Sequence, residues 1–378
     1  MSRIYRLLHI IDHLGSGGAQ ETLLSLVKYC DRRRFHVEVA TLHGQGHYWD
    51  SFRRLAAPLH ALSPHKYIPL YLPRLFYLLQ TGKFDLIHCH LTASNLIAKP
   101  LAAMLGVPLI FNYDQNDMYR TQQKTRLLLD RLANLLTDHI IAVSASTRDF
   151  LIQQEGVPAD KITIIYNGVD LERFHTAPDS STRATWRHAR GLPADTPLVA
   201  GVGRLRQQKN FPLFLRVARE VLREMPQAGF VIAGEGPDRQ DLEILARDLG
   251  IASQVHFLGY VTDMTELYAG VDVLLMTSHA EGTPLTVLEA MAMGVPVVAT
   301  RVDGMAEVLE DAVDAYLVSP GDLSALAHRT CGLLQDQALA QRFSQAGREK
   351  VRGHYSAVSM TQQLENIYLT YLQNRAMT

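Results

Sequence analysis

The sequence has little cysteine, and its cysteines match neither a disulfide framework nor a zinc site. Only Cys30, Cys89 and Cys331 occur among 378 residues, and no two of them form a C-x-x-C pair. Disulfide-stapled domains and thiolate zinc sites both need closely spaced cysteines. These two classes are therefore excluded, and the composition fits a reducing cytoplasm.

Long apolar runs and a strong net charge are also missing. The first apolar run, residues 4–11, is interrupted by Arg6 and His9, so it is too short and too polar for a signal peptide. No run of membrane-spanning length occurs in the sequence. The net charge of -1 gives no general attraction to nucleic acid. We therefore expect a soluble cytoplasmic protein that at most binds peripherally to the inner face of a membrane.

What the chain does contain is an alternation of apolar strand-like runs with helical segments. With 47% hydrophobic residues it can build real cores. Strands are predicted at residues 4–11, 35–42, 84–88, 107–112, 139–143 and 161–166, and again at 198–203, 229–233, 255–259, 271–276 and 295–300. Because strands that alternate with helices form parallel sheets covered on both faces, we predict an α/β protein with two Rossmann-like doubly wound domains.

The predicted domain boundary lies between the two series of strands. Residues 175–197 are rich in Pro, Ser, Thr and Asp and are the best linker candidate. We assign residues 1–175 to an N-terminal domain and residues 190–355 to a C-terminal domain. Ligands of such sheets lie beyond the carboxyl ends of the strands, and two such edges can face each other across a cleft. An amphipathic helix is predicted at about 356–378, without a sheet of its own.

One stretch in the second series has the features of an anion site. Residues 281–289 read E-G-T-P-L-T-V-L-E and follow a predicted strand. Thr283 is a good N-cap, and Pro284 suits the first helical position. A glycine at 294 and a proline at 296 end the helix. The first-turn N–H groups have no partner inside the helix and can bind an anion; they belong to Leu285, Thr286 and Val287.

Two carboxylates beside that helix start suit hydroxyl groups. Glu281 lies in the loop before the helix, and Glu289 lies inside the helix. Carboxylates only accept hydrogen bonds, so they match sugar and ribose hydroxyls. The residues therefore indicate a pocket for a phosphate flanked by hydroxyl-rich groups, which describes a nucleotide sugar. The alternative is an ordinary α/β loop with a solvated glutamate and a helix-surface glutamate, because similar helix starts are common.

A glycine loop follows the first predicted strand. Residues 14–20 read L-G-S-G-G-A-Q and open a helix. A strand, a glycine loop and a helix in this order bring backbone N–H groups onto a phosphate. The six-residue dinucleotide fingerprint is not met, because Gln20 stands at the third glycine position. A plain tight turn is an equally good interpretation of this loop.

Ordered motifs along essentially the whole chain resemble those of the family-four retaining glycosyltransferases. They are G-S-G-G-A-Q at 15–20, D-L-I-H-C-H at 85–90, N-G-V-D at 167–170, G-V-G-R-L-R-Q-Q-K-N at 201–210, G-E-G-P at 234–237, F-L-G-Y-V at 257–261, and the E-x7-E pair at 281 and 289 followed by A-M-A-M-G-V-P-V-V-A-T. Each motif alone is loose, but their joint order and spacing are specific. The resemblance implies the glycosyltransferase-B architecture, with a C-terminal helix that crosses back to the first domain.

The resemblance also implies a role for each matching residue. Arg204 and Lys209 would bind the donor diphosphate, the arginine as a fork and the lysine as a point charge. Glu289 would bind ribose, and Glu281 would contact the donor sugar and steady an oxocarbenium-like transition state. We take Glu281, Lys209 and Arg204 as the catalytic residues. The other implied donor contacts are Gly282, Thr283, Leu285 and Thr286, Tyr260 and Val261 near the base, and Gly17 and Gly18 from the first domain.

The acceptor side departs from the family pattern. The family commonly has a histidine where this sequence has Tyr113. Tyr113, Asp114 or Asp117 could partly replace it, although a phenol with a pKa near 10 donates hydrogen bonds better than it accepts a proton. His90 is a further candidate for the acceptor pocket, and a satisfied histidine at a strand end is the alternative.

Neither a metal nor a cofactor is expected. The sequence contains no D-x-D, so a metal-bridged diphosphate would have no ligands. Arg204, Lys209 and the helix start would stabilise the leaving diphosphate instead. The resemblance implies a UDP- or GDP-linked sugar as co-substrate, retention of the anomeric configuration, and loss of the acceptor proton to the departing phosphate.

A stretch in the first half suggests contact with a membrane. Residues 64–83 combine apolar and aromatic side chains with Lys66, Arg74 and Lys83. Such a surface would suit a lipid-linked acceptor. A core helix with ordinary flanks is the alternative. The acceptor is accordingly expected to be a glycan, a growing polysaccharide or a lipid-linked glycan.

Three other functions compete with glycosyl transfer. A nucleotide-sugar epimerase of the same two-domain architecture would release a changed sugar and free nucleotide without an acceptor. A nicotinamide dehydrogenase is disfavoured because Arg206 stands where a third glycine is needed after Gly201 and Gly203. A non-catalytic binding module would not need the full set of charged residues named above.

Overall fold

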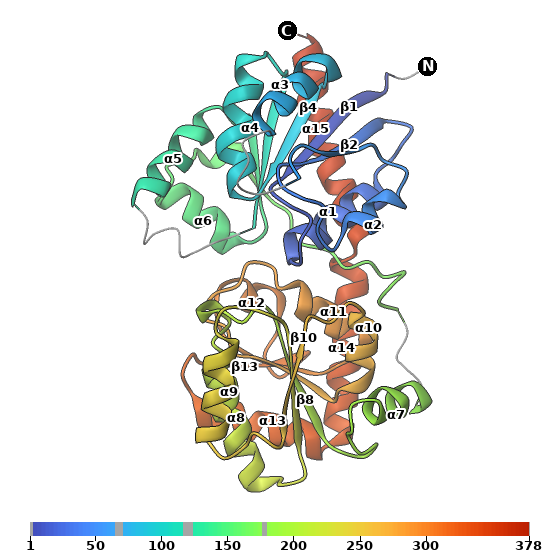
Figure 1. Ribbon diagram of the computed structural model, residues 1–378, viewed down its shortest axis with the longest axis vertical. Coiled ribbons are helices and arrows are strands. Elements are labelled where there is room, and N and C mark those ends of the chain that lie inside the picture. Colours follow the sequence, from blue (N-terminus) through green and yellow to red (C-terminus); the bar gives the residue numbers. More distant parts are fainter. Residues whose placement is uncertain (1–2, 65–70, 116–123, 176–179, 378) are drawn as a thin grey trace. The chain divides into compact units, whose positions relative to one another are not determined.

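The computed structural model describes residues 3–64, 71–115, 124–175 and 180–377. The chain divides into two compact units (Figure 1). Unit 1 comprises Met1–Gly168 together with Ala357–Thr378, and unit 2 comprises Val169–Ser356. Each unit has its own sheet and its own hydrophobic core.

Unit 1 is built on a seven-stranded sheet with the order β3-β2-β1-β4-β5-β6-β7. All of its strand pairs are parallel. The strands are β1 (Tyr5–Ile11), β2 (Phe35–Thr41), β3 (Leu59–Ala61), β4 (Leu86–His90), β5 (Leu109–Asp114), β6 (His139–Ala142) and β7 (Ile162–Ile164). The order reverses between β1 and β4, so the carboxyl ends of these two strands form the switch point of the sheet.

Helices cover both faces of this sheet (Figure 1). They are α1 (Gly18–Tyr29), α2 (Trp49–Arg53), α3 (Tyr71–Gly82), α4 (Thr92–Met104), α5 (Lys124–Leu135), α6 (Ala145–Gln153) and α15 (Ala357–Met377). Helix α15 returns from the end of the chain and packs along α1. Its Leu364 and Tyr368 join one core cluster with Leu7 and Ile11 of β1, while residues of α3 and α4 form another. The predicted helix that crosses back to the first domain is therefore confirmed.

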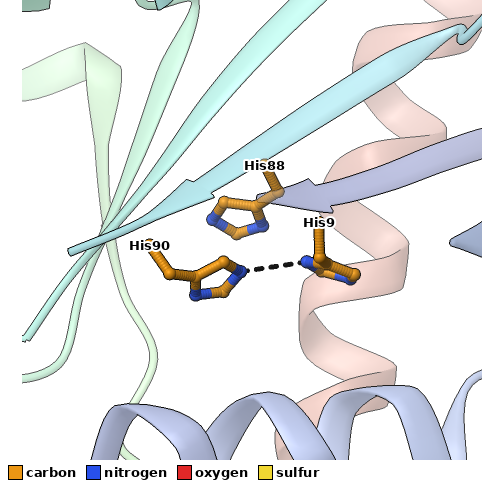
Figure 2. Close-up of side chains that lie close together, drawn as sticks. All are labelled: His9, His88 and His90. Atoms are coloured by element: carbon orange, nitrogen blue, oxygen red, sulfur yellow. Dashed lines mark hydrogen bonds between the residues drawn. The ribbon is translucent and has the colours of Figure 1, made fainter. Parts of the chain in front are cut away.

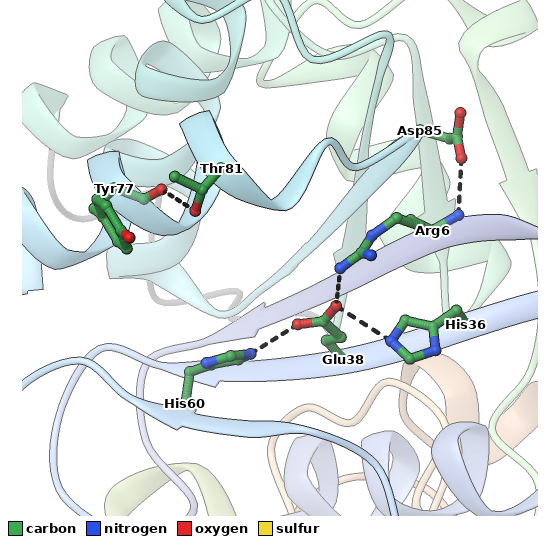
Figure 3. Close-up of polar contacts among 7 residues, drawn as sticks. All are labelled: Arg6, His36, Glu38, His60, Tyr77, Thr81 and Asp85. Atoms are coloured by element: carbon green, nitrogen blue, oxygen red, sulfur yellow. Dashed lines mark hydrogen bonds and ion pairs between the residues drawn. The ribbon is translucent and has the colours of Figure 1, made fainter.

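A buried carboxylate links three neighbouring strands of unit 1 (Figure 3). Glu38 on β2 accepts a hydrogen bond from Arg6 Nη2 of β1 at 2.5 Å, and its other oxygen lies 2.8 Å from His60 Nε2 of β3. The ring of His36 approaches the same carboxylate at 3.3 Å. A buried charge is tolerated only where it is paired and hydrogen-bonded, which explains a glutamate in this strand.

Unit 2 is built on a six-stranded sheet with the order β10-β9-β8-β11-β12-β13, again with parallel pairs only. The strands are β8 (Leu198–Val202), β9 (Gly229–Ala233), β10 (Val255–Gly259), β11 (Val273–Met276), β12 (Val297–Thr300) and β13 (Ala315–Val318). The helices are α7 (Ser180–His188), α8 (Phe211–Glu224), α9 (Arg239–Asp248), α10 (Met264–Gly270), α11 (Leu285–Met293), α12 (Asp303–Val308), α13 (Leu323–Gln335) and α14 (Gln337–His354). The switch point lies between β8 and β11.

The predicted fold class is confirmed, but the predicted linker is wrong. Residues 180–188 of the segment form α7, which packs against α10 inside unit 2. Arg187 is completely buried there; its Nε donates to the Gly270 carbonyl at 2.8 Å and its Nη2 to Asp272 at 2.7 Å. Polar composition suggested a linker, whereas the buried Trp186 and Arg187 are what fix this helix to the core. Residues 176–179 lie outside the described part of the chain.

The sequence pattern predicts most strands within about two residues, yet it misses β3, β13 and helices α2, α5, α10 and α12 to α14. The missed strands lie at sheet edges and α2, α10 and α12 are short, so their periodic pattern is weak. Helices α5, α13 and α14 have 12 to 18 residues, so length does not explain why the pattern misses them. Among the described residues, no helix combines the length and the hydropathy that a bilayer span requires.

Candidate functional site

The carboxyl edge of the unit 2 sheet brings together most of the residues predicted to bind the donor. The loop after β8 carries Arg204 and Lys209, and the loop after β11 carries Glu281. Because β8 and β11 are neighbours at the switch point, the loops that follow them begin side by side at this edge, which is where such sheets bind ligands. The topology therefore explains why residues more than seventy positions apart meet at one place.

Lys209 and Glu281 form an ion pair at this edge. The ammonium Nζ lies 2.6 Å from Glu281 Oε1, which also accepts a hydrogen bond from Ser278 Oγ at 2.6 Å. The glutamate side chain is 8% exposed and the lysine side chain 18% exposed. Within the described residues, no hydrogen-bond partner occurs on Glu281 Oε2. Contacts to Oε1 thus hold the carboxylate in place, and Oε2 can accept a hydrogen bond from a ligand.

The loop that carries Lys209 is held by β11. Asn210 takes a left-handed conformation with a φ of 49°, which turns the chain into α8. Thr277 Oγ1 donates toward the carbonyl oxygens of Lys209 and Asn210, at 3.3 and 3.0 Å. Gly203, at a φ of 149°, leaves room for the lysine stem, because a Cβ there would lie 3.1 Å from Lys209 Cε. The position of the ammonium is therefore set by packing before any ligand binds.

Helix α11 starts close to Glu281 in the sequence, one residue later than predicted. The N-cap is Pro284, not Thr283, and Pro284 is in an extended conformation with a ψ of 96°. Its carbonyl oxygen accepts from the N–H groups of Val287 and Leu288, so the predicted free N–H of Val287 is wrong. In the described structure the N–H groups of Leu285 and Thr286 have no backbone acceptor. The anion site that the sequence predicted is thus reduced to these two donors. The predicted end of the helix, at Gly294 with a φ of 78°, is confirmed.

Glu289 is buried one turn further along α11. Tyr268 Oη lies 3.0 Å from Glu289 Oε2 and 2.9 Å from the Thr286 carbonyl oxygen. Burial, and then the charge of Glu289, raise the pKa of Tyr268 well above 10, so the phenol keeps its proton. The phenol therefore orients the glutamate. A contact between Glu289 and ribose stays a prediction.

The remaining predicted donor residues of unit 2 lie along the same edge. Arg204 is exposed in the loop after β8. Tyr260 and Val261 are half-buried after β10, two strands away from β8 in the sheet. Gly282 is half-buried and Thr283 is buried. All of them belong to loops at the carboxyl ends of strands, which is the side where such sheets bind ligands.

Two residues of this edge were not predicted from the sequence. The Gly304 N–H donates to the Glu281 carbonyl at 3.0 Å, and a Cβ at Gly304 would lie 1.5 Å from the Gly282 carbonyl oxygen. Asp303 has a φ of 29°, which is rare for a residue other than glycine. Its Oδ2 is buried without a partner in the described structure, and burial, with the charge of Glu281, raises its pKa. The only sequence signal was an Asp-Gly pair after a predicted strand.

The glycine loop of unit 1 opens α1 as predicted. Gly17 is the N-cap, Gly18 is the exposed first residue of the helix, and Gln20 donates from Nε2 to the His13 carbonyl at 3.1 Å. At the neighbouring α4, the carboxylate of Asp12 already accepts from the N–H groups of Ala93 and Ser94, at 2.9 and 2.7 Å. These two N–H groups at the start of α4 therefore already have hydrogen-bond acceptors within the protein. Diphosphate binding by Gly17 and Gly18 stays a prediction.

The three predicted acceptor-side residues lie in the interior of unit 1. His90, Tyr113 and Asp114 are each at most 2% exposed. The Tyr113 hydroxyl lies 3.4 Å from Asn167 Oδ1, and burial raises its pKa to beyond the range of an ordinary phenol. Helix α15 packs over the face of the sheet that carries Tyr113, whereas Asp114, the next residue of β5, points to the opposite face, where α4 packs. None of the three is therefore presented on the surface of unit 1. Asp117 lies outside the described residues.

His90 belongs to a cluster of three buried histidines (Figure 2). His9 Nδ1 and His90 Nε2 are 3.0 Å apart, and His88 Nδ1 is hydrogen-bonded to the Tyr368 hydroxyl of α15. Two nitrogens bound to one tetrahedral zinc at about 2.0–2.1 Å would be about 3.4 Å apart. The spacing between His9 and His90 is instead that of a hydrogen bond. We therefore interpret the cluster as a hydrogen-bonded part of the core.

The cluster predicts a loss of stability in acid. Burial lowers the pKa of His9 from 6.5 to about 3 and the pKa values of His88 and His90 well below 6.5. Below about pH 6.5 the unfolded chain therefore binds protons that the folded chain does not, and each histidine removes up to about 1.4 kcal/mol of stability per pH unit. We expect the urea concentration at which half of the protein is unfolded to decrease as the pH is lowered from 7 to 5. His9→Asn should reduce this slope, whereas the exposed His279→Asn should not; equal slopes would contradict the interpretation.

Comparison with known proteins identifies the class. The family model described as "Glycosyl transferases group 1" matches residues 182–350, and the one described as "Glycosyltransferase Family 4" matches residues 16–173. The first match covers most of unit 2 and the second most of unit 1. The chain therefore belongs to the group 1 and family 4 glycosyltransferases of the glycosyltransferase-B fold, as its ordered motifs predicted.

Individual relatives agree with this class. The D-inositol 3-phosphate glycosyltransferase of Frankia alni is 30% identical over 276 residues, which cover 68% of this chain and 67% of the relative. The UDP-Gal:alpha-D-GlcNAc-diphosphoundecaprenol alpha-1,3-galactosyltransferase of Escherichia coli is 26% identical over 309 residues, 80% of this chain and 79% of the relative. HepE of Anabaena, solved with UDP and glucose, has the same fold, with a TM-score of 0.84 at 23% identity over 96% of this chain and 98% of that structure.

Proposed function

We propose that this glycosyltransferase moves a sugar from a nucleoside-diphosphate donor to a hydroxyl acceptor and retains the anomeric configuration. The observation that carries the proposal is the carboxyl edge of unit 2. There the two bare N–H groups of α11, the ammonium of Lys209 and the carboxylate of Glu281 lie on the loops that flank the switch point. Anionic and hydroxyl-rich groups in one ligand match this combination of donors and acceptor.

In this proposal the diphosphate binds to the positive groups. The N–H groups of Leu285 and Thr286 and the side chains of Lys209 and Arg204 stabilise the charge that grows on the leaving phosphate, because they are fixed before the reaction. The free Oε2 of Glu281 accepts from a donor-sugar hydroxyl and lies close to the positive charge that forms at the anomeric carbon. Glu289, oriented by Tyr268, binds the ribose.

The bond changes are a single displacement on one face of the sugar. The bond between the anomeric carbon and the phosphate oxygen breaks, the acceptor oxygen bonds to the same carbon, and the acceptor proton passes to the leaving phosphate. No metal and no cofactor take part, since the fixed cations of unit 2 supply the positive charge. UDP and GDP sugars are the donors that we propose; HepE, which has the same fold, was solved with UDP.

The proposed acceptor is a hydroxyl of a glycan, a polysaccharide or a lipid-linked glycan, and the proposed location is the cytoplasm at the inner face of a membrane. The name of the Escherichia coli relative includes a diphosphoundecaprenol-linked acceptor. The stretch 64–83, which suggested a membrane surface, has a mixed character. Leu75 and Leu79 of α3 are buried in the core, whereas Leu72, Phe76 and Tyr77 are exposed, and residues 65–70 lie outside the described chain.

Donor binding should be visible as thermal stabilisation. At a ligand concentration of about 100 times Kd, binding adds about 2.7 kcal/mol, which corresponds to a Tm increase of roughly 5–10 °C for a unit of this size. We expect this increase with UDP or GDP in buffer that contains EDTA, and a smaller one with the matching monophosphate. Lys209→Ala should remove most of it. Equal increases for diphosphate and monophosphate, or none with either diphosphate, would contradict the proposed site.

A further inference from the structure

The outward face of α5 concentrates exposed leucine. Among the described residues six leucines are exposed, and five of them lie on or directly after this helix; they are Leu128, Leu129, Leu132, Leu135 and Leu136, with exposed fractions from 39% to 75%. Residues three, four and seven apart lie on one side of a helix. The opposite side of α5, with Ala133 and Asn134, is buried against unit 1. The helix is therefore amphipathic with its apolar side turned outward.

Further apolar residues are exposed on the neighbouring helices. Helix α4 packs against both α5 and α3. Met104 at the end of α4 is 68% exposed, and Tyr77 of α3, which is labelled in Figure 3, is 68% exposed. Single exposed apolar residues are ordinary on a soluble protein, but a continuous group of them marks an interaction surface.

The exposed charged residues of helices α3, α4 and α5 are all basic. Helices α3 and α4 contain neither aspartate nor glutamate. The single acidic residue of α5, Asp130, is buried and paired with Arg126. Exposed charge comes from Arg74, Lys124 and Arg131. The surface is thus apolar and basic, and no exposed carboxylate of these helices opposes an anionic partner.

We propose that α5 docks unit 1 on the surface of a bilayer that contains anionic lipid. A helix with exposed leucines on one side and lysine or arginine at its rim lies in the plane of the interface, with the apolar side among the acyl chains and the cations near the headgroups. The inference deepens the proposed function by giving the enzyme a route to a lipid-linked acceptor. Docking itself depends only on unit 1, so it can be tested apart from catalysis.

A second copy of the chain fits this surface less well. Twelve residues of helix are about 18 Å long and about 10 Å wide, so the leucine face covers on the order of 200 Å², while a stable pair needs about 800 Å² from each partner. Two turns of leucine are also too few for a coiled coil. A bilayer needs no complementary shape, and it supplies the negative charge that the exposed Lys124 and Arg131 match.

The test is sedimentation of the full chain with vesicles at low salt. We expect binding to vesicles of phosphatidylglycerol and phosphatidylcholine in equal parts, weaker binding at high salt, and little binding to phosphatidylcholine alone. The triple variant Leu128→Gln, Leu132→Gln, Leu135→Gln keeps good helix formers and should weaken binding by about ten-fold or more. The control pair Ile244→Gln and Val313→Gln, at exposed apolar positions of unit 2, should bind like the parent chain.

The outcomes separate docking from catalysis. The triple variant should keep the thermal response to nucleoside diphosphate, and transfer to a water-soluble acceptor should be unchanged. The inference is overturned if the parent chain stays in the supernatant, or if the triple variant sediments as well as the parent. It is likewise overturned if the leucine substitutions convert a dimer into a monomer and leave vesicle binding intact, because the surface would then join two copies. Loss of the nucleotide response in the parent chain would refute the proposed function and not the docking.

Discussion

Glu281→Gln is expected to lower kcat by about 10²- to 10³-fold, which is the effect of removing one fixed electrostatic group from an active site. The amide keeps the size of the side chain but removes the negative charge that balances Lys209 at 2.6 Å and the transition-state cation. Because Ser278 also donates to the same oxygen, the amide can still be held in place. Initial rates with a labelled nucleotide sugar and its acceptor, followed by product separation, measure the effect.

The matched control is a glutamate in a partly exposed ion pair of the same unit. Glu243 pairs with Arg239 on α9 at 2.9 Å, and Glu243→Gln should change neither kcat nor Tm measurably, since exposed pairs contribute about 0–1 kcal/mol. Donor incubated without acceptor should yield no altered nucleotide sugar, which an epimerase would produce. Near-parent activity of Glu281→Gln, with the fold intact, would remove Glu281 from the catalytic group.

Gly304→Ala is expected to disrupt the carboxyl edge of the unit 2 sheet, because Gly304 packs against the loop that carries Glu281 and Gly282. The new Cβ would lie 1.5 Å from the Gly282 carbonyl oxygen and 3.2 Å from that of Glu281, far inside van der Waals contact, so the loop that carries both residues must move. We expect a loss of stability of at least about 1–3 kcal/mol, as for overpacking elsewhere, and a fall in donor affinity of ten-fold or more because a displacement of about 1 Å is severe for a positioned site. Thermal unfolding and nucleotide titration measure the two effects.

Gly332 supplies the comparison for that substitution. It lies in α13, and a Cβ added there would have no heavy atom within 4 Å outside its own helical backbone and chain neighbours. Gly332→Ala should therefore leave donor affinity unchanged and stabilise the helix by about 0.5–1 kcal/mol. If the two alanine variants behaved alike, the close approach of Gly304 to the loop before α11 would not matter for binding.

The sequence was sufficient to predict those elements whose bounds depend mainly on the residues within them. The strands of both sheets are largely apolar because helices cover both faces, and Gly294 marks the end of α11 through its left-handed conformation. The position of Glu281 before a helix start singled it out, the family resemblance implied the role of Lys209, and the neighbouring order of β8 and β11 brings the two into contact.

Tertiary contacts decided what the sequence could not predict. Pro284 caps α11 with its own carbonyl, so Thr283 is not needed as the cap. A polar segment became α7 because Arg187 is buried beside Asp272. His90 was expected near an acceptor, but α15 returns from the far end of the chain and encloses the histidines. The role of Gly304 depends on the approach of two segments more than twenty residues apart.

The most direct test of the central claim is a crystal structure of the chain with the nucleoside diphosphate that stabilises it most. We expect diphosphate oxygens at about 3 Å from the N–H groups of Leu285 and Thr286 and from the cationic groups of Lys209 or Arg204, with ribose at Glu289. A nucleotide bound elsewhere, with no phosphate at the start of α11, would contradict it.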